Sequence, residues 1–178
     1  MSDVIKIQDD FLTLEENKDL WDNLMRIPWS ICSDILGKDL QCDELDNMQF
    51  QNLMYSSDTP RGNGLWIVSP ILNKLPIASL CRVKVNFNPR RDRIIKHGFH
   101  TDFPFECTTA IYYVNSNDGC TTFEDGTVVE SVANRLVTFP STMKHTGSTC
   151  TNAKGRMVVN FNYFATDCSE WLEFIKDK

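Results

Sequence analysis

The stretch Arg82-Val83-Lys84-Val85-Asn86-Phe87-Asn88 decides the fold class of this chain. Polar and apolar side chains alternate along it, and a period of two is typical of a strand with one buried face. Pro89 ends the strand because proline has no amide hydrogen to donate to a neighbouring strand. Short stretches of the same kind follow at 97–102, 108–115, 120–123, 128–132, 135–139 and 156–164.

Turn signals separate these stretches. Asn117-Asp118-Gly119 and Glu124-Asp125-Gly126 are both typical of the turns that join hairpin strands. About eight short strands with such turns predict a mainly β fold with flanking helices, in which two sheets pack as a double-stranded β-helix, or jelly roll.

Helices in the N-terminal part of the chain are predicted to pack against this jelly roll and support it. Thr13 and Glu16 have the spacing of a capping box, which starts a helix that Pro28 ends. Leu65–Val68 is interpreted as a strand, and 69–80 is expected to contain a helix. We expect one domain over 1–178, with 1–80 as helical support and substrate loops, 81–164 as the jelly-roll core and 165–178 as a C-terminal helix.

Charge and cysteine content narrow the class of protein. The net charge of -6 disfavours a broad electrostatic grip on nucleic acid. The seven cysteines are odd in number and have no CxxC spacing, which predicts reduced thiols and a cytoplasmic location. The apolar runs are too short to span a bilayer, so no membrane partner is expected.

His100-Thr101-Asp102 is the segment with the clearest chemistry. On a strand, residues i and i+2 point to the same face, so the imidazole and the carboxylate reach one point. His145 lies 43 residues after Asp102 and would add a second imidazole from another strand. Two imidazoles and one carboxylate form the facial triad of non-haem Fe(II) oxygenases. The motif is short and chance matches are common, but the chain has only three histidines, and the third, His97, is predicted to be exposed.

A 2-oxo acid co-substrate such as 2-oxoglutarate would chelate this iron and leave a distal carboxylate that needs a cation. Arg156 lies 11 residues after His145 and opens the last apolar strand, where a guanidinium can bind a carboxylate in a bidentate manner. Lys154 is the competing cation, and its polar neighbours predict an exposed turn.

Several blocks of the sequence carry a family resemblance. They are His100 to Pro104, Thr109 to Asn115, Asn134 to Ser141, His145 itself, and Arg156 to Phe164. In order and spacing, these blocks over about residues 81–164 resemble the 2-oxoglutarate- and Fe(II)-dependent oxygenases of the prolyl hydroxylase type. The segment at 48–64 matches no part of that pattern, and the double glycine usual before the Phe123 strand is reduced here to Gly119-Cys120.

The resemblance implies site residues and cofactors. It implies Fe(II), 2-oxoglutarate and O2, with ascorbate as a further reductant. Asp102 is present, whereas halogenases of this superfamily lack that carboxylate, so hydroxylation is expected. The implied residues are His100, Asp102 and His145 as iron ligands, Arg156 and Tyr113 at the distal carboxylate, and Asn86 and Asn160 at the mouth of the barrel.

The expected activity is hydroxylation of a substrate with decarboxylation of 2-oxoglutarate to succinate. A prolyl or other peptide residue is one substrate, and a small metabolite or nucleobase is the alternative. A cupin-like iron enzyme without 2-oxoglutarate and a non-catalytic jelly-roll binding module remain as rivals. Residues 48–64 and 90–99 are expected to grip the substrate, with the basic side chains Arg90, Arg91, Arg93 and Lys96 facing an acidic or phosphate-bearing group.

Overall fold

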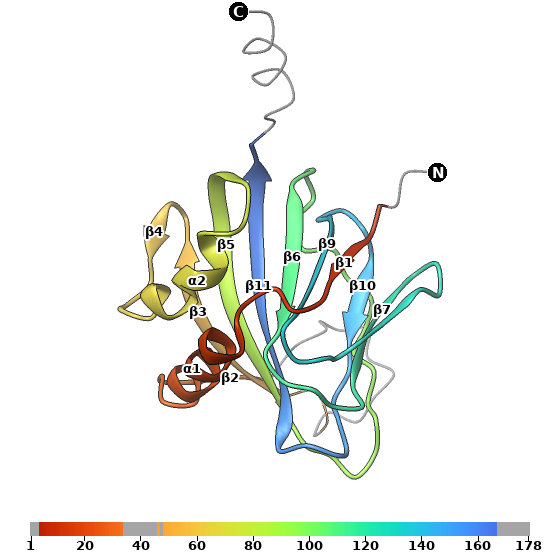
Figure 1. The fold of residues 1–178 in the computed structure, drawn as a ribbon. Coiled ribbons are helices and arrows are strands. Elements are labelled where there is room, and N and C mark those ends of the chain that lie inside the picture. Colours follow the sequence, from red (N-terminus) through yellow and green to blue (C-terminus); the bar gives the residue numbers. More distant parts are fainter. Residues whose placement is uncertain (1–3, 34–45, 47, 167–178) are drawn as a thin grey trace, which may run out of the picture.

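Two antiparallel sheets form the body of the protein in the computed structural model, which describes residues 4–33, 46 and 48–166. Within these residues the large sheet has eight strands, in the order β1-β9-β6-β11-β5-β3-β2, with β4 paired to β3. The small sheet has the order β10-β7-β8. The predicted mainly β jelly roll is confirmed, and Figure 1 shows β7 and β10 on one side of the large sheet and α1 and α2 on the other.

The elements have the following bounds. In chain order they are β1 Lys6–Gln8, α1 Leu14–Leu24, β2 Ser30–Cys32, β3 Gln49–Ser56, β4 Thr59–Pro60, the 3-10 helix η2 Leu65–Val68, α2 Ser69–Leu72, β5 Ile77–Pro89, β6 Thr108–Tyr113, β7 Cys120–Phe123, β8 Val128–Glu130, β9 Arg135–Pro140, β10 His145–Gly147 and β11 Gly155–Ala165.

Strands β6, β9 and β11 of the large sheet each contribute to two cores. Tyr112 belongs to the outer core, which packs against the helices through Leu20 and Leu24. Tyr113, the next residue, belongs to the inner core between the sheets, with Phe123 of β7. Both tyrosines are fully buried. Layers on both faces of the sheet are the reason.

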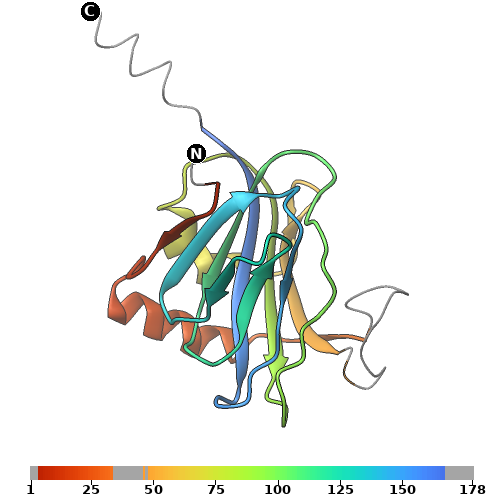
Figure 2. The same ribbon diagram turned by 90° about the vertical axis from the view of Figure 1, so that its right-hand side faces the viewer.

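The N-terminal helix begins as predicted. The Thr13 hydroxyl accepts a hydrogen bond from the Glu16 amide at 3.1 Å, and the Glu16 carboxylate accepts one from the Thr13 amide at 2.8 Å. This capping box satisfies amides that lack partners within the helix. In Figure 2 the short strands of the small sheet lie in front of β11. The small sheet thus covers the inner face of the large sheet, and the helices pack on the other face.

Four local expectations were wrong. Leu65–Val68 forms a 3-10 helix, and its Leu65, Ile67 and Val68 side chains pack in the outer core. Residues 97–102 form no strand and contain one isolated bridge, between His100 and His145. Asn117-Asp118-Gly119 joins strands of different sheets, so it does not form a hairpin turn. The other predicted turn is present: Gly126, at φ 90, lies in the turn between the paired strands β7 and β8. Gln49–Ser56, within the 48–64 segment expected to be a loop, forms strand β3, and the expected helix at 165–178 lies mainly outside the described residues.

Two further observations concern cysteines and membranes. None of the cysteines within the described residues forms a disulfide: Cys32, Cys81, Cys107, Cys120 and Cys150. No helix in the described part of the chain is both long and apolar enough to span a bilayer.

Candidate active site

Two histidines meet where the segment before β6 crosses strand β10. His100 and His145 form an antiparallel bridge in which each amide donates to the other's carbonyl at 3.0 Å. His145 Nδ1 lies 3.0 Å from the carbonyl oxygen of Met143, so a proton on Nδ1 would leave Nε2 as the free acceptor. With Asp102, their nearest ligand atoms all lie within 4.8 Å of one another. The structure therefore brings together the three residues that the sequence predicted as ligands.

Asp102 is held by a dense set of donors. Arg82 Nη2 donates to Oδ1 at 2.6 Å, Thr109 Oγ1 donates to Oδ2 at 2.8 Å, and Asn162 Nδ2 donates to Oδ2 at 3.0 Å. Burial alone would raise the pKa of this carboxyl, but Arg82, His145 and the amides outweigh it and hold the pKa well below its usual range. Asp102 is therefore an anion, ready to bind a cation.

A polar cavity of about 160 Å³ opens beside the triad. Strands β5 and β11 form its floor, where Lys84 pairs with Asn160 and Asn88 pairs with Arg156. The four polar residues of β5 that alternate with the buried valines all line it, together with all three histidines: Arg82, Lys84, Asn86, Asn88, His97, His100 and His145. The stretch that decides the fold class, Arg82 to Asn88, therefore also supplies part of the floor of the site.

Arg156 closes the far end of this cavity. Its side chain is 3% exposed, and no carboxylate lies within 4.0 Å of it among the described residues. Nε donates to Ser131 Oγ at 2.8 Å and Nη2 donates to Thr121 Oγ1 at 2.9 Å. Burial lowers the pKa of this guanidinium. A buried cation without an anion is costly, so the arrangement suits an anionic ligand.

Tyr113 lies beneath that guanidinium. The Arg156 Cζ is 5.5 Å from the centre of the Tyr113 ring, and the Tyr113 hydroxyl donates to Thr121 Oγ1 at 2.8 Å. Among the described residues that line the cavity, Tyr113 is absent, whereas Arg156, Asn86 and Asn160 are present. In the structure, Tyr113 packs against Arg156 and is not part of the cavity lining.

Two glycines leave room for the arginine. A Cβ on Gly147 would come within 3.1 Å of Arg156 Nη1, and a Cβ on Gly119 would come within 2.8 Å of Arg156 Cδ. Gly147 lies two residues after His145 on β10, so it faces the same cavity. The missing side chains keep open the space around the guanidinium.

Four buried polar atoms around the cavity have no hydrogen-bond partner among the described residues. They are Asn86 Oδ1, Asn88 Oδ1, His97 Nε2 and Asn160 Oδ1. Buried polar atoms without partners are rare in folded proteins, and a cluster of them around one cavity indicates a polar ligand or ordered water. Sequence reasoning missed Asn88, although it follows Asn86 by two residues on the same strand and alternation alone would have placed it here.

His97 also lines this cavity, which corrects the prediction that it is exposed. It is 7% exposed, because its amide bonds to Gly147 and its carbonyl accepts from Thr146, which draw the segment under β10. Burial, with the positive charge of Arg156, lowers the pKa of His97 to about 4. His97 is therefore neutral at pH 7.

The basic side chains predicted to face a substrate lie elsewhere. Among the described residues that line the cavity, none is from 90–96, and the cations there are Arg82, Lys84 and Arg156. Arg93 pairs instead with Asp46 and Asp92. Lys154 is exposed, as predicted.

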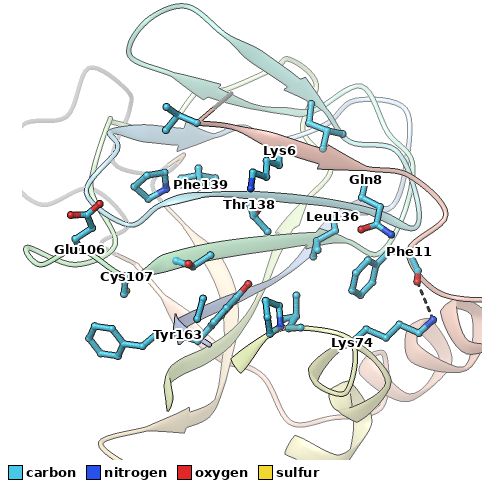
Figure 3. Close-up of a pocket in the computed structure, with 18 residues that line it drawn as sticks. Lys6, Gln8, Phe11, Lys74, Glu106, Cys107, Leu136, Thr138, Phe139 and Tyr163 are labelled. Atoms are coloured by element: carbon cyan, nitrogen blue, oxygen red, sulfur yellow. Dashed lines mark hydrogen bonds between the residues drawn. The ribbon is translucent and has the colours of Figure 1, made fainter. Parts of the chain in front are cut away.

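A second cavity, of about 610 Å³, lies on the outer face of the large sheet. Figure 3 shows Lys6, Thr138, Leu136 and Tyr163 along it, with Lys74 Nζ donating to the Phe11 carbonyl at 3.1 Å. Its described lining contains no histidine. Within the described part of the chain, the one group of three potential metal ligands lies at the inner cavity.

Comparisons with known proteins place the fold. No family model matches the chain, and no curated protein matches its sequence. A prolyl hydroxylase from Trichoplax adhaerens, in complex with a peptide fragment of a hypoxia inducible factor, is similar in structure with a TM-score of 0.64 and 12% identity, over 91% of this chain and 84% of its own. An oxidoreductase of the 2-oxoglutarate-Fe(II) oxygenase family from Burkholderia pseudomallei gives 0.64 and 12%, over 91% and 86%.

A third similar structure has a different activity. The epimerase SnoN, in complex with Fe3+, alpha ketoglutarate and nogalamycin RO, gives a TM-score of 0.63 at 11% identity, over 92% of this chain and 79% of its own. At such identities the likeness shows the fold alone. The chain has the double-stranded β-helix fold of the prolyl hydroxylases and other 2-oxoglutarate- and Fe(II)-dependent oxygenases, with His100, Asp102 and His145 as a candidate iron site.

Proposed function

We propose that this protein is a 2-oxoglutarate- and Fe(II)-dependent dioxygenase, with His100, Asp102 and His145 as the iron ligands. Arg156 carries the proposal because it is a buried guanidinium without a carboxylate partner in the described chain, and it opens into the same cavity as the triad. A non-catalytic binding module would have no reason to keep both features in one cavity. Arg156 is the partner of the distal carboxylate of 2-oxoglutarate.

The residues present fit both groups. Two imidazoles and one carboxylate are the donor set that Fe(II) oxygenases use, and they leave further coordination positions open. Gly147 keeps clear the space beside Arg156 Nη1 that a carboxylate would enter. The unpartnered atoms of Asn86 and Asn160 lie in the same cavity and are assigned to the co-substrate or substrate. Iron at this site supplies oxygen activation coupled to decarboxylation of 2-oxoglutarate to succinate.

The chain's own residues orient and neutralise the reactants. Arg82, Asn162 and Thr109 fix the Asp102 carboxylate as an anion, and the Met143 carbonyl sets the ring of His145. Phe123 and Phe139 pack against the His145 ring, with centroids 6.2 and 4.8 Å away, and exclude water from that side. Tyr113 positions Arg156 through the shared Thr121 hydroxyl.

Hydroxylation is the reaction that we propose, with O2 as oxidant and ascorbate as an auxiliary reductant. Asp102 occupies the carboxylate position, which leaves no ligand position for a halide in its place. The Trichoplax adhaerens enzyme in complex with a peptide supports a peptide substrate, whereas SnoN supports a small molecule and an epimerisation. Detection of product oxygen from 18O2 by mass spectrometry separates hydroxylation from epimerisation. We also propose a cytoplasmic location, where cysteines that form no disulfide are usual.

An anaerobic titration tests the proposal. The apoprotein receives Fe(II) and then 2-oxoglutarate, and the visible charge-transfer band of the chelated 2-oxo acid is recorded. We expect the wild-type protein to form the band, H145A to lose it, and R156M to need at least about tenfold more 2-oxoglutarate, because a charge-assisted contact is lost. R93M, an exposed arginine outside the cavity, is the matched control. Iron binding without a band, or a band indifferent to R156M, would overturn the assignment.

A further inference from the structure

Strand β5 presents two cations to the cavity, and they differ in their partners. Arg82 is committed to Asp102, at 2.6 Å, and to the Asn162 side-chain carbonyl, at 3.0 Å. Lys84, two residues on, has no carboxylate within 4.0 Å in the described part of the chain, although the side chain is half-buried. A second cation without an anion therefore lines the same cavity as Arg156.

The charge of the cavity is opposite to that of the protein. Arg82, Lys84 and Arg156 are its positive side chains and Asp102 is its only carboxylate among the described residues, so the lining carries +2 while the whole chain carries -6. Fe(II) and the doubly negative 2-oxoglutarate would cancel each other and leave this excess unchanged. A cavity with excess positive charge attracts anions and raises their local concentration.

Position separates the roles of the two unpaired cations. Lys84 pairs across the sheet with Asn160, whose amide reaches Asp102 at 3.2 Å, so Lys84 lies at the metal end of the cavity. Arg156 is four residues away from Asn160 along β11, which is about 13 Å of strand. A 2-oxoglutarate that chelates the metal and extends its distal carboxylate to Arg156 therefore leaves Lys84 without an anion.

We infer that Lys84 binds an anionic group of the substrate, a carboxylate or a phosphate, beside the metal end of the cavity. The inference rests on the proposed function, because it assigns Arg156 to the co-substrate. It replaces the sequence-based view that Arg90, Arg91, Arg93 and Lys96 receive an acidic substrate. Burial and the charge of Arg82 lower the pKa of Lys84, and a substrate anion would reverse this shift.

The test uses two anionic probes and one neutral probe. Protein loaded with Zn(II), which occupies such sites without redox chemistry, is saturated with 2-oxoglutarate so that Arg156 is taken. Binding of 4-fluorobenzoate, 4-fluorophenyl phosphate and 4-fluorobenzamide is then followed by 19F NMR. We expect one or both anions to bind and the amide to bind at least about tenfold more weakly, since a charge-assisted contact to Lys84 is missing.

Variants of Lys84 locate the contact. K84M should weaken anion binding about tenfold or more, K84R should retain most of it, and K96M, an exposed lysine outside the cavity lining, should change nothing. K84Q gives a second neutral variant, and thermal unfolding checks that each variant is folded. A preference for the carboxylate or for the phosphate probe identifies which anion the substrate carries.

The outcomes separate this inference from the oxygenase proposal. If neither anion binds, or if K84M binds the anions as well as the wild-type protein does, the inference is wrong while the oxygenase stands. If K84M weakens 2-oxoglutarate binding as strongly as R156M does, Lys84 belongs to the co-substrate and the inference is also wrong. If the wild-type protein binds the anions through Lys84 but forms no 2-oxoglutarate complex, the anion site is supported and the oxygenase proposal fails.

Discussion

His100 and His145 lie directly opposite each other, joined by two backbone hydrogen bonds of 3.0 Å, with ring centroids 4.7 Å apart. Backbone pairing thus holds the two imidazoles together before any metal arrives. Preorganisation of this kind reduces the conformational entropy that is lost when a ligand binds. The second imidazole comes from His145 on β10, which only the tertiary structure brings beside the segment that contains His100.

Removal of His145 should abolish tight metal binding. H145A takes away one of the three ligands, and we expect Fe(II) affinity to fall at least about 100-fold, since loss of groups behind a ligand alone costs about 10–100-fold. Anaerobic calorimetry measures the affinity. H97Q is the matched control, because His97 lies in the same cavity but outside the ligand cluster. Equal losses in both variants would contradict the assigned triad.

A methyl group on Gly147 should weaken 2-oxoglutarate binding and leave Fe(II) binding intact. In G147A the new Cβ lies 3.1 Å from Arg156 Nη1, so the guanidinium must shift by a few tenths of an ångström. We expect about a tenfold loss of 2-oxoglutarate affinity in the anaerobic titration. In the control G64A, the new Cβ has ordinary contact with Met54 at 3.4 Å, away from the site. An unchanged affinity in G147A would show that Arg156 does not hold the co-substrate.

Loss of the Asp102 carboxylate should destabilise the apoprotein. D102A leaves Arg82 and the amides of Asn160 and Asn162 without their acceptor, and we expect a fall of about 3 kcal/mol in the free energy of unfolding. Urea unfolding measures it without metal. D9A is the matched control, because Asp9 also pairs with an arginine, Arg135, but is exposed and should cost no more than about 1 kcal/mol. Similar losses in the two variants would argue against a tightly held carboxylate.

Acid should destabilise the protein through His97. Its pKa is lowered to about 4 in the folded state against about 6.5 when unfolded, so below pH 6.5 the unfolded state binds a proton that the folded state does not. The contribution of His97 to the free energy of unfolding is complete above pH 6.5 and is lost as the pH falls toward 4. The loss amounts to about 2 kcal/mol at pH 5. Urea unfolding of the wild type and H97Q at pH 7 and pH 5 measures the difference. If His97 has no effect, H97Q and the wild type will lose the same stability between these pH values.

Local sequence patterns predicted many elements well. The alternation of Arg82 to Asn88 lies within β5, Cys120–Phe123 is β7, and the capping box of Thr13 starts α1. These features depend on neighbouring residues, so a local pattern contains the information. The same reasoning failed for Leu65–Val68, because a short apolar run fits a 3-10 helix that packs in the core as well as it fits a strand.

By itself, the sequence determined the kinds of residue available for chemistry: a His-x-Asp segment, a distant histidine, an arginine opening the last strand, and a β5 with one polar face. Only the tertiary structure decided that this polar face turns inward, so that Lys84, Asn86 and Asn88 line the cavity. It also decided that His97 is buried and that Tyr113 packs against Arg156. The physical reason is that alternation defines two faces of a strand, whereas the side on which each face lies depends on pairing with residues far away in the chain.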